Sequence, residues 1–135
     1  MQTFLPFPDF AQTASSLEWR RLGKQRVETL ELLAALAGDS KGWVNHPATR
    51  MWRGYEAALI EYGVAICLEW RRRGYRDTCL EKIQAFASRF PASPRPPWLG
   101  DPAFHAAHRS NLRRKDPVFY ASFDEPPDLP YIWPV

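Results

Sequence analysis

The chain has 135 residues, of which 45% are hydrophobic and 24% are charged, as in one globular domain, and this composition excludes a disordered tail. No stretch approaches the roughly 20 apolar residues of a membrane span, signal-peptide features are missing, and two cysteines are too few for a disulfide framework, so we expect a cytoplasmic protein with reduced thiols. All 18 basic residues but only 11 of the 15 acids lie at or before Lys115, and the resulting charge of +7 on this part favours a polyanionic partner, most often nucleic acid.

The first predicted helix covers residues 16–37. Ser15 followed by Glu18 is the pattern of a capping box, in which two side chains satisfy free backbone N–H groups at a helix start. Leucines recur at helical spacing from Leu22 onward, and Gly38 follows where a helix C-terminus commonly has glycine. Charged side chains fill the first half and apolar ones the second. We therefore expect the first half in water and the second half in the core.

A loop over residues 38–45 leads to a second long helix, predicted from about Pro47 to Arg73. Apolar side chains recur there at intervals of three and four, which is the spacing of a core-facing stripe. Gly54 and Gly63 lie inside this helix, and each disfavours it by about 1 kcal/mol relative to alanine. We therefore expect close contacts with other helices at these two glycines.

Thr78 with Glu81 indicates a third helix start, and this helix ends before the proline-rich connector 91–100. Asp101 followed by proline predicts another helix, which runs to about Lys115, and a short helical turn follows over 116–120. No alternation typical of strands is present. The sequence thus predicts an all-α fold, one compact domain of about five helices. We divide it into residues 1–76, further helices over 77–115, and an extended tail over 116–135 that is rich in proline and aromatic residues and packs on the body.

The first group of candidate functional residues combines the N-terminus with the polar half of the first helix. Glu28 lies among several cations, which favour its ionised form, and such a carboxylate can stabilise positive charge on a sugar ring. A solvated helix face with pairs such as Lys24 and Glu28 explains the same pattern. The candidate DNA contacts here are Arg21, Lys24, Gln25 and Arg26.

A second group surrounds the start of the second long helix and comprises Asn45, His46, Arg50 and Arg53. An amide, an imidazole and two guanidiniums at a helix start suit contacts with phosphates or bases. His46 also suits a helix cap. Nearby tryptophans, Trp43 and Trp52, could stack on a base or belong to the core.

The third group lies on the last predicted helix. His105 and His108 share one helix face, but no third ligand lies near them, so we expect no metal. Arg109, Arg113 and Arg114 fall on overlapping faces, which favours phosphate binding, and His108, Arg109 and Arg113 are the candidate DNA contacts of this helix. No glycine-rich phosphate loop, paired Cys-x-x-Cys or nucleophile elbow is present, and this absence removes the common nucleotide-binding and hydrolase readings.

Several of these segments together resemble one enzyme family. They are the short aromatic N-terminus, the polar helix start from Leu17 to Glu28, the run Gly42-Trp43-Val44-Asn45-His46-Pro47, and a long helix ending Arg73-Gly74-Tyr75. The pattern is similar to the pyrimidine-dimer DNA glycosylases, small all-helical enzymes of the phage endonuclease V type, and their bacterial relatives. The likeness covers roughly residues 1–76.

The resemblance implies a mechanism. The α-amine of Met1 would attack the sugar C1′ and form a Schiff base, and Glu28 would be the essential carboxylate. An α-amine has a pKa near 8, so part of it is neutral and nucleophilic in the cell. The residue before the glutamate is Val27 where the relatives have arginine, so Arg26 or Lys24 would take its place.

The expected partner is damaged double-stranded DNA, with no cofactor and with the protein as a monomer. Two rival functions remain open. The protein could be a non-catalytic nucleic-acid-binding protein that uses the same basic face, or an enzyme on a small anionic substrate in a pocket near His46 and His108.

Overall fold

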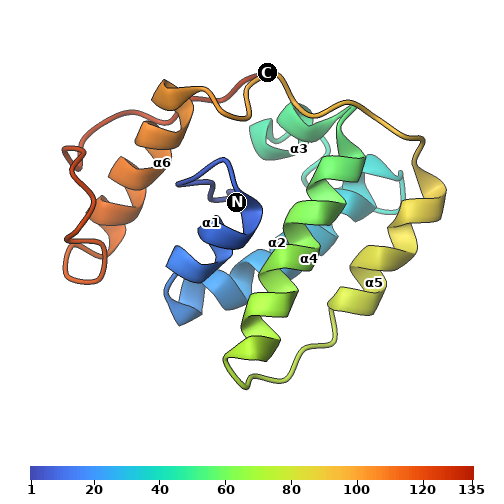
Figure 1. The fold of residues 1–135 in the computed structure, drawn as a ribbon. Coiled ribbons are helices and arrows are strands. Elements are labelled where there is room, and N and C mark those ends of the chain that lie inside the picture. The colour runs from blue at the N-terminus through green and yellow to red at the C-terminus, as the bar shows by residue number, and fades with distance from the viewer.

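The computed structural model describes residues 1–135 and contains six α-helices, one 3-10 helix and no strand (Figure 1). The predicted all-α fold class is therefore confirmed. In chain order the elements are α1 (Phe10–Ser16), α2 (Trp19–Leu36), α3 (Pro47–Trp52), α4 (Glu56–Arg72), α5 (Leu80–Ala85), η1 (Phe86–Arg89) and α6 (Pro102–Lys115).

The first helix does not begin where the capping-box pattern predicts. Residues 10–16 form a separate helix, α1, and the Ser15 hydroxyl lies inside it and donates to the Gln12 carbonyl. Glu18 alone is the N-cap of α2, because its carboxylate accepts from the backbone N–H groups of Arg20 and Arg21 at 2.8 and 3.0 Å. The prediction of Ser15 as N-cap is thus wrong, whereas α2 ends at Leu36, one residue before the predicted end.

The second long helix is divided into α3 and α4 by Gly54, whose backbone φ of +87° lies in the left-handed region. The Glu56 carboxylate accepts from the Gly54 N–H at 2.9 Å and stabilises this break. Gly54 therefore forms a turn and not the predicted helix contact. The prediction for Gly63 is confirmed, since a Cβ there would lie 2.6 Å from the Thr29 side chain of α2.

The helix starts at α5 and α6 both use an aspartate. For α5 it is Asp77, which accepts from the backbone N–H groups of Cys79 and Leu80, so the predicted capping box of Thr78 and Glu81 is wrong. The predicted start of α6 is confirmed, because Asp101 accepts from the Ala103 N–H and proline follows it. The predicted end of α6 at Lys115 is confirmed as well.

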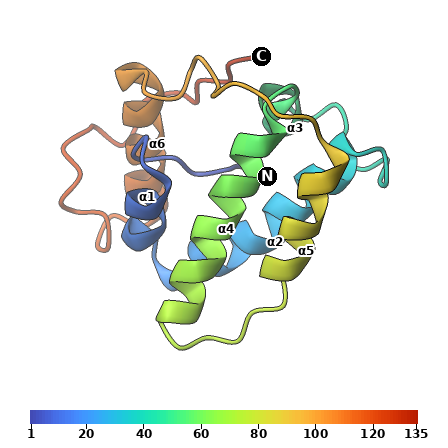
Figure 2. The same cartoon turned by 45° about the vertical axis from the view of Figure 1, so that its right-hand side comes forward.

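Helix α4 lies at the centre and packs against α1, α2 and α5 (Figure 1). Its buried side chains, among them Leu59, Tyr62 and Ile66, join Trp52 of α3 in one hydrophobic core. Turning the view shows that the N-terminal segment passes between α6 and α4 (Figure 2). The fold therefore encloses the first residues of the chain between helices that are far apart in the sequence.

After α6 the chain forms turns and then contains no helix or strand. The Ser110 hydroxyl donates to the Pro126 carbonyl, and Arg113 donates to the Glu125 carbonyl at 2.9 Å, so α6 holds this stretch. The last residues pass over the molecule toward α3 (Figure 1), where Trp133 packs against the core. None of the six helices combines the length and apolar composition that crossing a membrane requires.

Candidate active site

Residues 2–5 run through the interior and are held by side chains. Their four backbone N–H groups donate in turn to the Glu28 carboxylate, the Gln2 side-chain oxygen, the Gln25 side-chain oxygen and Nδ1 of His108, at 3.2, 2.9, 3.1 and 2.9 Å. A buried backbone N–H without a partner costs free energy, so each acceptor helps to fix the segment. The start of the chain consequently has one defined position.

Two of these acceptors come from one face of α2, because Gln25 and Glu28 are three residues apart. Gln25 is 1% exposed, and its side-chain amide also donates to the Gln2 carbonyl at 2.8 Å. Its oxygen accepts a second hydrogen bond from the Tyr62 hydroxyl at 2.7 Å. Gln25 therefore anchors the N-terminal segment, although it was predicted as a DNA contact.

The other anchor is a pair of histidines on α6 that hold Leu5 by both backbone groups. His105 accepts from the Gly100 N–H through Nε2, so its Nδ1–H donates to the Leu5 carbonyl at 2.7 Å. His108 is fully buried, and burial lowers its pKa to about 3. His108 therefore stays neutral and inside, which corrects its predicted role as a DNA contact.

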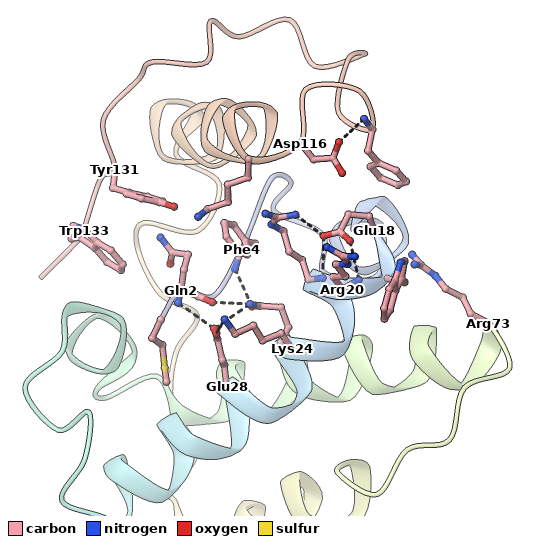
Figure 3. A pocket seen from close by; sticks show the side chains of 16 residues that line it. Gln2, Phe4, Glu18, Arg20, Lys24, Glu28, Arg73, Asp116, Tyr131 and Trp133 are labelled. Carbon is pink, nitrogen blue, oxygen red and sulfur yellow. Dashed lines mark hydrogen bonds and ion pairs between the residues drawn. The ribbon is translucent and has the colours of Figure 1, made fainter.

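A cavity of about 970 Å³ opens beside this segment (Figure 3). Its walls are the N-terminal segment, the first half of α2, the end of α6, and two aromatic residues near the C-terminus, Tyr131 and Trp133. Figure 3 shows Glu28 and Gln2 beside each other, with Tyr131 and Trp133 on one side and Glu18 and Arg20 on the other. Met1 and Glu28, the two predicted catalytic residues, both line this cavity.

The α-amine lies close to Glu28 without pairing with it. Three bonds join the amine to the next amide nitrogen, so the two nitrogens are at most about 3.7 Å apart. Since the Gln2 N–H donates to Glu28 Oε2, the amine lies within about 7 Å of that oxygen. Lys24 Nζ, at 3.9 Å, is the cation that pairs with Glu28. The α-amine is therefore more than 4.0 Å from the Glu28 carboxylate oxygens, since no ion pair joins them, and within about 7 Å of Oε2.

His46 belongs to the same neighbourhood. Its Nδ1 accepts from the Ala48 N–H at 3.0 Å, which makes it the N-cap of α3. Burial, and then the positive charge of the α-amine, lower the pKa of His46. The imidazole is therefore neutral at cellular pH, and the fold brings this residue of the second predicted group near the amine.

Five basic side chains line the cavity, namely Arg20, Arg21, Lys24, Arg73 and Lys115. Arg21 pairs with Glu18 at 2.8 Å and Arg73 with Glu69 at 2.7 Å, whereas Arg20 and Lys115 belong to none of the ion pairs. Burial and the charge of nearby arginines lower the pKa of Lys115. Arg20 and Lys115 are thus the cations most available to an anionic ligand.

Three predicted DNA contacts have structural partners. The Arg26 guanidinium donates to the buried Asp77 carboxylate at 2.7 Å and lies 4.5 Å over the Trp70 ring, away from the cavity. Arg109 pairs with Glu125 at 2.6 Å, and Arg113 donates to the backbone of the same residue. Arg26, Arg109 and Arg113 therefore help to hold the fold, and their contacts with DNA stay predictions.

Of the second predicted group, the fold brings only His46 near the α-amine. Asn45, Arg50 and Arg53 are exposed on and beside α3 and do not line the cavity, so their contacts with DNA stay predictions. Several lining residues are not among the site residues predicted from the sequence: Trp19, Arg20, Lys115, Phe119, Tyr131 and Trp133. For Trp19 a sequence signal existed, because this large aromatic residue lies among the charged residues at the start of α2. The structure leaves 55% of it exposed. The C-terminal aromatics reach the cavity only through tertiary packing and had no local signal.

No three His, Cys, Asp or Glu residues lie close enough together to hold a metal ion. Comparison with protein families finds that the family model described as pyrimidine dimer DNA glycosylase matches residues 1–82. No curated protein and no solved structure matches the chain. The matched part contains the α-amine, Glu28 and His46, and it covers well over half of the chain. The chain therefore belongs to the pyrimidine dimer DNA glycosylase family.

Proposed function

We propose that the protein is a DNA-repair glycosylase and abasic-site lyase that acts on damaged pyrimidines through the α-amine of Met1. The observation that supports this proposal most is the anchoring of residues 2–5, which fixes the amine beside the Glu28 carboxylate at a cavity edged by cations. An amine nucleophile needs a defined position near its target carbon. Three of the four N–H groups are held by buried side chains of α2 and α6, and this anchoring supplies that position.

In the proposed reaction the lone pair of the neutral amine forms a bond to C1′ while the bond from C1′ to the damaged base breaks. The base leaves with that electron pair and takes up a proton from water. Opening of the C1′–O4′ bond gives the Schiff base, the ring oxygen accepting the proton that the nitrogen loses. Glu28 offsets positive charge on the sugar, as carboxylates do in glycoside hydrolysis.

The lyase step follows from the Schiff base. Removal of a hydrogen from C2′ sends its electron pair into a C2′–C3′ double bond, and the 3′ phosphate leaves with the C3′–O electron pair. In this proposal Glu28, the carboxylate bound to the Gln2 N–H, accepts that proton. Water then hydrolyses the Schiff base and returns the amine.

The DNA must open for C1′ to reach the amine, which costs a few kcal/mol. Phosphate contacts offset this cost, and Arg20 and Lys115 are the unpaired cations of the cavity that would supply them. Trp19 and Phe119, both more than half exposed at the cavity, present ring faces on which a base can stack.

The test is borohydride trapping of the Schiff base. Wild-type protein is incubated with a duplex that contains an abasic site or a pyrimidine dimer, borohydride is added, and mass spectrometry locates the adduct on a peptide. We expect one DNA adduct, on the N-terminal peptide. Protein whose α-amine has been dimethylated is the control, because a tertiary amine cannot form a Schiff base.

Glu28→Gln separates the carboxylate's chemistry from its anchoring role, since the new amide oxygen still accepts from the Gln2 N–H. We expect strand cleavage to fall at least about a hundredfold, in line with other positioned acid–base groups, while DNA affinity stays near that of the wild type. An adduct on Lys115, or equal cleavage by Glu28→Gln, would contradict the proposal. DNA binding without any adduct would instead favour the non-catalytic binder.

A further inference from the structure

Trp43, in the loop between α2 and α3, has an unusual backbone conformation. Its φ of +65° is the only positive φ outside glycine, and its side chain is 46% exposed. Bulky residues rarely adopt this conformation, and glycine is the residue that usually fills it. The fold thus keeps a large indole on the surface at a position where its backbone is strained.

Hydrogen bonds to the Trp43 carbonyl hold this conformation. The His46 N–H donates to it at 3.1 Å and the Thr49 hydroxyl at 2.5 Å. The indole is not part of the hydrophobic core cluster. Since strain of this kind is commonly kept at functional sites, the placement of the ring calls for a role other than packing.

The ring is the outer end of an aromatic row that leads to the cavity. The Trp43 and His46 rings are 5.4 Å apart, His46 and Trp133 are 5.7 Å apart, and Trp133 and Tyr131 are 5.6 Å apart, all between centroids. Trp133 and Tyr131 line the cavity (Figure 3). The row is therefore continuous from the cavity wall to the exposed face of Trp43.

The charge around Trp43 suits a nucleic acid. Lys41, Arg50 and Arg53, on the same loop and on α3, are exposed and belong to none of the ion pairs. Unpaired surface cations beside an exposed aromatic face are the two components of sites that bind unpaired nucleotides, the cations contacting phosphates and the ring stacking on a base.

We propose that Trp43 stacks on a base that is left unpaired at the damaged site, so that the DNA-binding surface extends from the cavity along the aromatic row to this loop. This inference rests on the proposed function, because it needs a duplex opened at the cavity. It assigns to Trp43 the recognition of opened over intact DNA, and it assigns Lys41, Arg50 and Arg53 to the flanking phosphates.

The test compares two duplexes, one intact and one with a stable abasic-site analogue opposite a normal base, in equilibrium binding. Trp43→Gly removes the ring and relieves the backbone, so the thermal midpoint of unfolding should stay the same or rise. We expect it to weaken binding of the abasic duplex roughly tenfold, the usual range for one stacked base, and to leave intact duplex unchanged. Trp43→Phe should keep most of the affinity. Tyr75→Ala, an exposed aromatic outside the cavity lining, is the matched control.

Equal weakening for both duplexes, or no weakening, would overturn the proposal, and so would a fall in the thermal midpoint of Trp43→Gly that Trp43→Phe reverses. The binding assay needs no chemistry, so it stays informative if the wild-type protein forms no borohydride adduct. Conversely, Trp43→Gly should still form the adduct at saturating abasic DNA. Loss of the amine mechanism and loss of the stacking role therefore give different results.

Discussion

The two histidines that hold Leu5 make the protein sensitive to acid. Burial lowers the pKa of His108 from its ordinary value of 6.5 to about 3, and burial lowers that of His105 as well. Above pH 6.5 His108 is neutral in both the folded and the unfolded chain, and its contribution does not change with pH. Between pH 6.5 and 3 the unfolded chain binds a proton that the folded chain excludes, so the free energy of unfolding falls as the pH falls.

The slope of the free energy of unfolding against pH follows from the difference between the pKa of His108 in the unfolded and in the folded chain. One pH unit below 6.5 lowers the free energy of unfolding by at most about 1.4 kcal/mol for His108, so two units remove roughly 3 kcal/mol. A domain of this size is stable by about 5–15 kcal/mol, which makes the loss measurable. Asp77 adds little above about pH 4.5, because its pKa is 3.8 in the unfolded chain and is lowered to about 2 in the folded chain, so the carboxylate is largely ionised in both states there.

The assay is urea unfolding followed by tryptophan fluorescence, from about pH 7.5 to about pH 4.5. His108→Asn keeps an oxygen that can accept from the Leu5 N–H but cannot titrate. It should be less stable than the wild type at pH 7.5, since the contacts of the imidazole with the Phe4 and Phe104 rings are lost. The difference should narrow as the pH falls. Two parallel curves of stability against pH would refute the reasoning.

Three further predictions concern packing, a buried ion pair and the cavity. Gly63→Ala should lower the free energy of unfolding by about 1–3 kcal/mol, because the new Cβ lies 2.6 Å from the Thr29 side chain, whereas Gly42→Ala should be near neutral in the same urea titration. Asp77→Ala leaves Arg26 and Arg71 without their buried partner and should cost about 3–5 kcal/mol by thermal unfolding. Glu81→Gln, at the exposed end of the same network, should cost much less, and similar losses for the two variants would count against the buried pair. Lys115→Gln should weaken DNA binding and reduce the slope of log affinity against log salt by about one between about 50 and about 200 mM, and an unchanged slope, as expected for Lys82→Gln, would remove Lys115 from the phosphate contacts.

Local sequence signals predicted that helices form in these segments better than they predicted the residues at which the helices begin and end. Asp101 and the proline after it gave the start of α6 correctly, because an aspartate cap acts on amides two residues away. The same kind of reasoning failed at Ser15, where Glu18 caps α2 by itself and a further short helix precedes it. The break at Gly54 was also missed, since glycine is compatible with a helix contact as well as with a left-handed turn.

The candidate site was predictable where its residues are close to the N-terminus. Met1 and Glu28 line one cavity, as the family resemblance implied, and Lys24 lies beside them. The basic residues were harder to assign, because their partners are distant in sequence. Arg26 pairs with Asp77, which is 51 residues away, and His108 holds Leu5, which is 103 residues away. From the sequence alone, Arg26 and His108 are indistinguishable from exposed residues that are free to bind a ligand. Their partners are identified only in the tertiary structure.

The hydrogen bonds that join His105 and His108 to Leu5 have a consequence for the synthesis of the chain. Leu5 is among the first residues to leave the ribosome, but both histidines that bind it are made about a hundred residues later. Until α6 has been translated, Leu5 has no partner for either of its backbone groups, and only the contacts of Gln2 and Phe4 with α2 can form. A chain shortened to the part that the family model matches, residues 1–82, would lack α6 altogether. Nascent and shortened chains should therefore hold Gln2 and Phe4 through Glu28 and Gln25 of α2, but leave Leu5 without its two histidine partners.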